Sequence, residues 1–304
     1  MLQYLIILLD DTSVSYCHYK NRKTERKLIS IPDLEAGILF AMKQNLMIQF
    51  VYPAYDLPKE YLPVIESIDH NKIVPYSGTI ENADVIVLDG WDNLPKKTDI
   101  PVILRTGKSE FSFNYKKLIP LLKEVKRLNV VITDIETFKD NDFTSYESAL
   151  SELKNTIEEQ YLKGVFPQLN ILSDRIMLDK MNNCNAGVEN ITLAPNGKFY
   201  ICPAFYLEDE SDSVGDLVNG LNIKNKQLYK LAFAPLCRVC DAYQCKRCVW
   251  LNRKTTLEVN TPSHEQCVVA HLERNASREL LIYFPDKEIK KIDYLDPFDV
   301  REEF

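Results

Sequence analysis

The sequence predicts an α/β protein, with an open, partial barrel of parallel strands followed by a small cysteine-rich domain. Two observations support this fold class. In the first half, short apolar runs alternate with amphipathic stretches of helical period, which is typical of βαβ units around a parallel sheet. In the second half, seven of the eight cysteines lie between Cys184 and Cys267. There are about five or six strand–helix units, too few to close an eight-fold barrel.

The predicted strands of the first half are continuous apolar runs, as expected for strands buried on both faces. We expect strands at 4–9, 47–52, 73–76, 84–88, 101–104 and 129–133, and helices at 32–46, 59–68, 113–128 and 146–161. Pro120 should kink or split the third of these helices, because proline removes a backbone donor and clashes with the preceding turn.

The hydrophobic period changes after residue 190. Segments 191–194 and 198–202 flank Asn196-Gly197, a dipeptide that supplies the positive φ of a tight hairpin turn. Residues 261–266 are typical of a helix start, which would place Cys267 one turn into a helix. We therefore divide the chain into a partial barrel at 1–170, a cysteine-rich domain at 171–283, and an acidic, aromatic tail at 284–304.

Composition excludes several classes of partner. The chain has 37 Lys+Arg against 44 Asp+Glu and a net charge of −7, which gives no basic surface for nucleic acid. The longest apolar run, Leu5 to Leu9, is too short to span a membrane, so we expect no membrane partner and a cytoplasmic location. Cytosolic thiols stay reduced, so a dense set of cysteines there indicates metal binding.

Four of the cysteines follow the spacing Cys237-x2-Cys240-x4-Cys245-x2-Cys248. A Cys-x2-Cys loop directs both sulfurs at one metal, and two such loops can close a tetrahedral zinc site. One zinc ion on these four cysteines leaves three further cysteines unexplained, so the seven thiols suit two metal sites better than one. Thiolates in that number fit iron–sulfur clusters at least as well as zinc. Arg238, Lys246 and Arg247 lie among these cysteines and would stabilise an anionic cluster.

The cysteine pattern resembles the SPASM domain, which follows the catalytic barrel of many radical SAM enzymes. The resemblance rests on Cys184, Gly197, Cys202, the four-cysteine segment and Cys267, with Asn185-Ala186-Gly187 and Val214-Gly215-Asp216-Leu217 as further matches. It implies two auxiliary 4Fe-4S clusters, one on Cys237, Cys240, Cys245 and Cys267, the other on Cys184, Cys202 and Cys248 with a fourth iron that is open or held by another group. The four-cysteine segment departs from the family in its spacing. The family usually has five and three residues between the last three cysteines, whereas this chain has four between Cys240 and Cys245 and two between Cys245 and Cys248.

The first half resembles a radical SAM barrel whose cluster motif is altered. That family has Cys-x3-Cys-x2-Cys after the first strand, and in this frame the chain has Ser13, Cys17 and Lys20, with Tyr19 as a match. One thiolate cannot hold a cluster, so Cys17 is either a structural or surface thiol or a vestigial ligand. The segment 53–56 also replaces the Gly-Gly-Glu that contacts S-adenosylmethionine in the family. We therefore expect the usual cleavage of S-adenosylmethionine to be absent.

The whole chain, including the segment 8–17, is similar to the CXXX repeat peptide maturases. This resemblance implies an enzyme that matures a cysteine-rich, ribosomally made precursor peptide, with a companion modification protein as a further partner. Two alternatives stay open: a non-catalytic protein that binds the peptide for a separate enzyme, and a zinc-binding structural domain.

The residues predict few catalytic groups. Asp10 and Asp11 follow the first strand, at the position where α/β folds form their binding crevice, so they could contact a ligand. Alternatively, they only end the strand and contact water at the rim of the sheet. With Cys17 they are the catalytic candidates. His264, three residues before Cys267, is either a cluster ligand or an exposed residue of a first helical turn.

Overall fold

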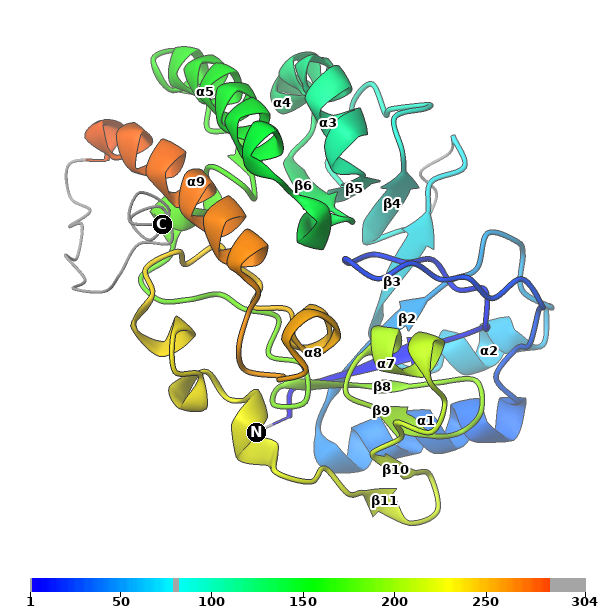
Figure 1. The fold of residues 1–304 in the computed structure, drawn as a ribbon. Coiled ribbons are helices and arrows are strands. Elements are labelled where there is room, and N and C mark those ends of the chain that lie inside the picture. The colour runs from blue at the N-terminus through cyan, green and yellow to red at the C-terminus, as the bar shows by residue number, and fades with distance from the viewer. Residues whose placement is uncertain (1, 79–81, 285–304) are drawn as a thin grey trace. The chain divides into compact units, whose positions relative to one another are not determined.

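The computed structural model describes residues 2–78 and 82–284 and divides into two compact units (Figure 1). The first unit comprises Met1–Val87 and Asn185–Phe233, and the second comprises Leu88–Cys184 and Ala234–Phe304. Each unit combines segments from both sides of residue 170. The predicted domain boundaries at residues 170 and 283 are therefore not tested by this division and stay predictions. All of the predicted tail except Phe284 lies outside the described residues.

Nine strands form one sheet in the order β7-β6-β5-β4-β3-β2-β1-β8-β9. The strands of each unit pair in parallel, except that β8 and β9 are antiparallel. The order ends at β7 and β9 without closing, which confirms the predicted open α/β sheet. The strands are β1 (Tyr4–Leu8), β2 (Met47–Val51), β3 (His70–Pro75), β4 (Val85–Asp89), β5 (Val102–Thr106), β6 (Arg127–Ile132), β7 (Gln168–Leu169), β8 (Asn190–Leu193) and β9 (Phe199–Tyr200), and a separate antiparallel pair is formed by β10 (Gly215–Asp216) and β11 (Gly220–Leu221).

Helices connect most of the strands. The α-helices are α1 (Ile31–Gln44), α2 (Tyr61–Ile65), α3 (Lys108–Asn114), α4 (Leu118–Glu124), α5 (Asp140–Tyr161), α6 (Asp174–Met177), α7 (Pro203–Glu208), α8 (Val249–Thr256) and α9 (His264–Glu279), and the short 3-10 turns are η1 (Tyr115–Lys117), η2 (Ile135–Thr137), η3 (Lys226–Tyr229), η4 (Leu231–Phe233), η5 (Cys237–Val239) and η6 (Leu280–Tyr283). Pro120 lies in the first turn of α4, where proline is tolerated, so the predicted split occurs just before it. No helix in the described part of the chain is long and apolar enough to cross a membrane.

The core of the first unit lies between β1 and α1. Leu5, Ile7 and Leu9 are fully buried and belong to the same core cluster as Leu34 and Ile38 of α1. Ser30 is the N-cap of helix α1, and its Oγ accepts a hydrogen bond from the Asp33 backbone N at 3.2 Å. The apolar runs therefore form buried strands, and a capped amphipathic helix covers them.

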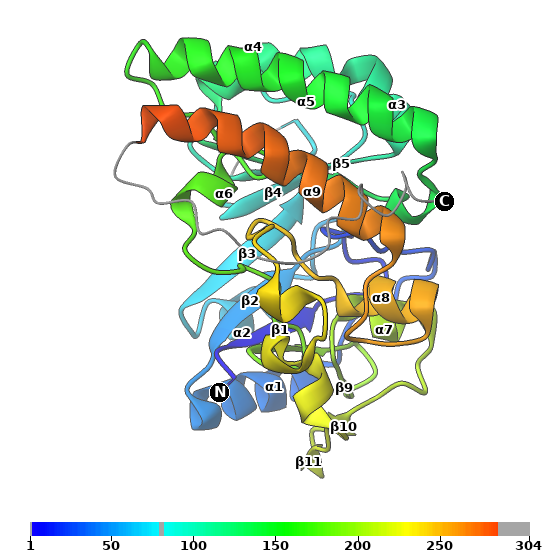
Figure 2. The same ribbon diagram turned by 60° about the vertical axis from the view of Figure 1, so that its left-hand side comes forward.

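The second unit places α5 beside α9 (Figures 1 and 2). Helix α5 buries an apolar stripe that includes Phe143, Leu150 and Leu153. Helix α9 begins after Ser263, whose Oγ accepts from the Gln266 backbone N at 3.4 Å. This confirms the predicted helix start and places Cys267 in the first turn of α9.

Candidate metal centre

Four thiols gather in the second unit, on the segment 237–248, here called the knuckle loop, and on α9. Burial raises the pKa of the Cys245 thiol well above its usual value, and the nearby sulfurs of Cys237, Cys240 and Cys267 raise it further. Burial likewise raises the pKa of Cys237 to about 11 and that of Cys267 to about 12. Metal binding at these thiols must therefore displace protons.

The knuckle loop is held against α9 by charged and polar side chains. Asp241 is fully buried, and its Oδ1 lies 3.1 Å from Arg274 Nη1. Its Oδ2 contacts Arg278 and lies 3.6 Å from Arg175 Nη2. Gln244 Nε2 donates to the Ala270 carbonyl at 2.7 Å. Three cations therefore surround one carboxylate of the loop, and this excess of positive charge favours a further anion nearby.

Several N–H groups point at the sulfurs. The backbone N of Ala242 donates to Cys240 Sγ, and that of Arg247 donates to Cys245 Sγ, each at 3.4 Å. His271 is buried, and its Nε2 also lies 3.4 Å from Cys240 Sγ. Hydrogen bonds of this kind stabilise thiolates and tune the metal that they bind. Sequence reasoning overlooked His271, although its position four residues after Cys267 places both on one face of a helix.

Zinc and an iron–sulfur cluster require different arrangements of the donor atoms. No group of three or more His, Cys, Asp or Glu residues within 2–78 and 82–284 is placed to hold a single metal ion. Sulfurs around one zinc must lie roughly 3.8 Å apart, which follows from tetrahedral Zn–S bonds of about 2.3 Å. A four-iron cluster binds one thiolate at each iron and so accommodates more widely spaced sulfurs. Cys237, Cys240, Cys245 and Cys267 interact electrostatically with one another and supply the thiol donors that such a cluster uses, and their role as its ligands stays a prediction.

The other predicted ligands are divided between the two units. Cys184 and Cys248 belong to the second unit, and the Cys184 backbone N donates to the Lys246 carbonyl at 3.2 Å, beside the end of the knuckle loop. Cys202 belongs to the first unit, immediately before α7. A second cluster on these three cysteines stays a prediction.

The loop after β1 is hydrogen-bonded to itself and to β2. Ser13 is buried, and its Oγ accepts from the Asp10 backbone N at 3.0 Å and donates to the Val51 carbonyl at 2.9 Å. Asn21 Nδ2 donates to the carbonyls of Asp11 and Ser13 at 2.7 and 2.9 Å. Lys20 is exposed, and Cys17 is half-buried. A cluster held by three thiolates does not fit the residues of this loop.

The two carboxylates at the end of β1 are buried. Asp11 Oδ2 lies 3.1 Å from Lys23 Nζ, and Asp11 Oδ1 accepts from the Tyr206 hydroxyl. Asp10 Oδ1 accepts from the Thr12 backbone N at 2.7 Å. Asp11 therefore links the loop to α7, which is a structural role. A catalytic role for Asp10, Asp11 or Cys17 stays a prediction.

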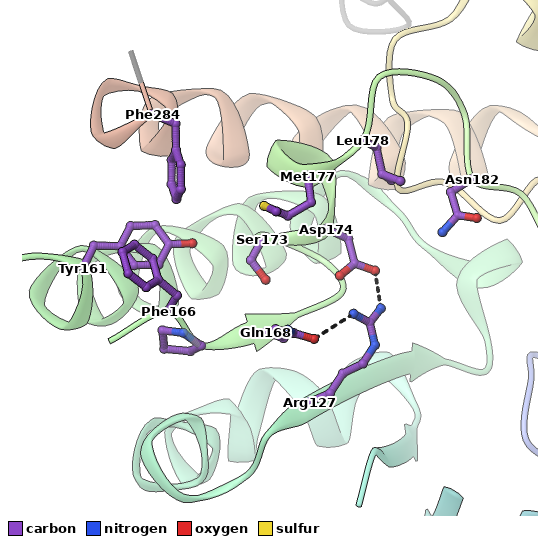
Figure 3. Close-up of a pocket in the computed structure, with 11 residues that line it drawn as sticks. Arg127, Tyr161, Phe166, Gln168, Ser173, Asp174, Met177, Leu178, Asn182 and Phe284 are labelled. Atoms are coloured by element: carbon purple, nitrogen blue, oxygen red, sulfur yellow. Dashed lines mark hydrogen bonds and ion pairs between the residues drawn. The ribbon is translucent and has the colours of Figure 1, made fainter. Parts of the chain in front are cut away.

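The second unit also contains a cavity of about 460 Å³ at the start of β6 and β7 (Figure 3). Tyr161, Phe166 and Phe284 form its apolar side, and on the other side Arg127 Nη2 lies 2.6 Å from Asp174 Oδ2. None of the predicted metal ligands lines this cavity.

The open, mostly parallel sheet with its covering helices is a fold that this chain shares with solved structures. The chain is similar to the solved structure of anSMEcpe with bound AdoMet and the Cp18Cys peptide, with a TM-score of 0.65 and 16% identity over 94% of this chain and 99% of that chain. It is also similar to anSMEcpe with bound AdoMet, with a TM-score of 0.64 and 16% identity over 93% of this chain and 100% of that chain. No protein-family model matches the chain, and no curated protein matches it in sequence.

Proposed function

We propose that this protein is a peptide maturase of radical-SAM-like fold whose C-terminal thiols hold iron–sulfur clusters. The observation that carries the proposal is the gathering of Cys237, Cys240, Cys245 and Cys267 between the knuckle loop and α9, with N–H donors directed at two of the sulfurs. A second cluster would use Cys184, Cys202 and Cys248. Such clusters supply one-electron transfer and an iron that can bind a substrate thiolate.

The substrate that we propose is a cysteine-repeat peptide made on the ribosome, presented with or without a companion modification protein in the reducing cytoplasm. Two lines of argument support a peptide: the resemblance of the sequence to CXXX repeat peptide maturases, and the similarity of the fold to anSMEcpe, which has been solved with a bound peptide. The chain's own cysteines would hold the clusters.

A non-catalytic peptide-binding protein is the second candidate function. The observation that favours it is the loop after β1, where Ser13 is hydrogen-bonded to Val51 and cannot act as an iron ligand without breaking that bond. In this case the cysteine domain would present the peptide to a separate enzyme.

Two measurements separate these functions. Purification without oxygen, followed by iron, sulfide and zinc analysis, should give two clusters in each chain, whereas stoichiometric zinc without sulfide would leave only the structural-domain alternative. Co-expression with a peptide that carries Cys-x-x-x repeats should change the mass of the peptide if the protein is the maturase. An unchanged mass with intact clusters would favour the binding protein.

A further inference from the structure

We infer that His271 is a positioning residue of the cysteine site, donating a hydrogen bond from Nε2 to the Cys240 sulfur and raising the reduction potential of the cluster held there. This inference rests on the proposed function, because it concerns a cluster on Cys237, Cys240, Cys245 and Cys267. It adds a residue whose importance the cysteine spacing does not predict.

The geometry of α9 places His271 at the site. His271 lies four residues after Cys267, so both side chains are on one face of the helix. The His271 side chain is only 4% exposed, and its Nε2 lies 3.4 Å from Cys240 Sγ. The knuckle loop and α9 are joined independently of any metal through Asp241 and Arg274 and through Gln244 and Ala270. The contact between Cys240 and His271 is therefore held by the fold.

The direction of the hydrogen bond follows from the chemistry of the sulfur. A thiolate bound to iron has no proton and can only accept, so a neutral imidazole in this contact must carry its proton on Nε2. Cys240 Sγ already accepts from the Ala242 backbone N at 3.4 Å, and His271 gives it a second donor. Donors to a ligand sulfur withdraw negative charge from the cluster, which makes the reduced state easier to reach.

The test compares three variants of the full chain, reconstituted with iron and sulfide without oxygen. H271F removes the donor and keeps a ring, and H271Q keeps an N–H donor. H264F alters an exposed histidine of the same helix, three residues before Cys267. The readouts are iron and sulfide content and the midpoint potentials from a redox titration followed by electron paramagnetic resonance.

We expect H271F to retain the wild-type iron content and to shift one midpoint potential to a more negative value. The potential of the other cluster should not change, so it serves as an internal control. H271Q should recover most of the shift, and H264F should match the wild type. If H271F does not fold, H271L removes the same donor with a smaller side chain.

Three results would overturn the inference. Unchanged potentials in H271F show that the contact does not tune the cluster, and equal shifts in H271F and H271Q show a purely steric role. Loss of iron from H271F with normal folding makes His271 a ligand instead. A wild-type protein that binds neither iron nor sulfide overturns the proposed function together with this inference. The iron and sulfide content of the wild type is measured before any variant is compared, so this failure is separated from a failure of the inference alone.

Discussion

Asp241 and Arg274 form a buried ion pair in the second unit, with Asp241 Oδ1 3.1 Å from Arg274 Nη1. Asp241 directly follows Cys240, and Arg274 lies on α9, so this pair joins the two segments that carry the four gathered thiols. The knuckle loop is thus positioned by a carboxylate that is not itself a predicted ligand.

Removing this carboxylate should strongly destabilise the protein. D241N leaves Arg274 and Arg175 buried without their counter-charge, and breaking a buried ion pair in this way costs about 3–5 kcal/mol of unfolding free energy. Anaerobic denaturant unfolding measures the loss. D179N, at an exposed position, is the control and should change stability by less than about 0.5 kcal/mol. Equal effects of D241N and D179N would contradict this role.

The cysteines should differ in their importance for iron binding. C240A should remove one cluster, because it deletes a sulfur with N–H donors in the gathered set. It should also lower the thermal midpoint, since bound metal contributes to folding. C17A should leave the iron content close to that of the wild type. Equal iron losses in C240A and C17A would mean that the first loop does hold a cluster.

The protein should not cleave S-adenosylmethionine by the usual radical route. In the frame of the family motif only Cys17 is a thiol, Ser13 is hydrogen-bonded to the Val51 carbonyl, and Lys20 is an exposed cation. Reductant with S-adenosylmethionine should therefore give no 5′-deoxyadenosine above background by liquid chromatography, with or without a peptide. Production of 5′-deoxyadenosine that is abolished in C17A would show that the first loop is active after all.

Glu273 should make stability depend on pH. Burial raises the pKa of this carboxyl from 4.5 to about 7, although Tyr146 and Gln244 donate to it and lower the pKa in part. Between these values the folded protein keeps a proton that the unfolded chain has lost. The contribution of Glu273 to stability is therefore greatest below about pH 4.5 and is lost as the pH rises to about 7.

Anaerobic unfolding between pH 5 and 8 would measure this effect. For one group the slope is at most about 1.4 kcal/mol per pH unit. E273Q should flatten the decrease, and E147Q, at an exposed position of α5, should not. The Cys237 and Cys267 thiols, with pKa values of about 11 and about 12, titrate outside this range. An unchanged pH profile in E273Q would show that the decrease has another origin.

Local chemistry made several parts of this molecule predictable from sequence alone. The buried strands follow from uninterrupted apolar runs, and the β8–β9 hairpin follows from Gly197, whose φ of +72° suits the tight turn. The split before α4 follows from Pro120, and the start of α9 follows from the cap at Ser263. Each of these signals depends on neighbours within a few residues, so no knowledge of the tertiary structure was needed.

Tertiary structure decided the contacts between residues that lie far apart in the chain. Tyr146 and Glu273 are separated by 127 residues, and only the packing of α5 beside α9 places the Tyr146 hydroxyl 2.8 Å from the carboxylate. The packing of the knuckle loop on α9 places His271 beside Cys240. Ser13 matches a ligand position by spacing, but the fold places it against Val51 on the adjacent strand. Sequence spacing predicted which thiols are candidates, whereas long-range packing determined which side chains surround them.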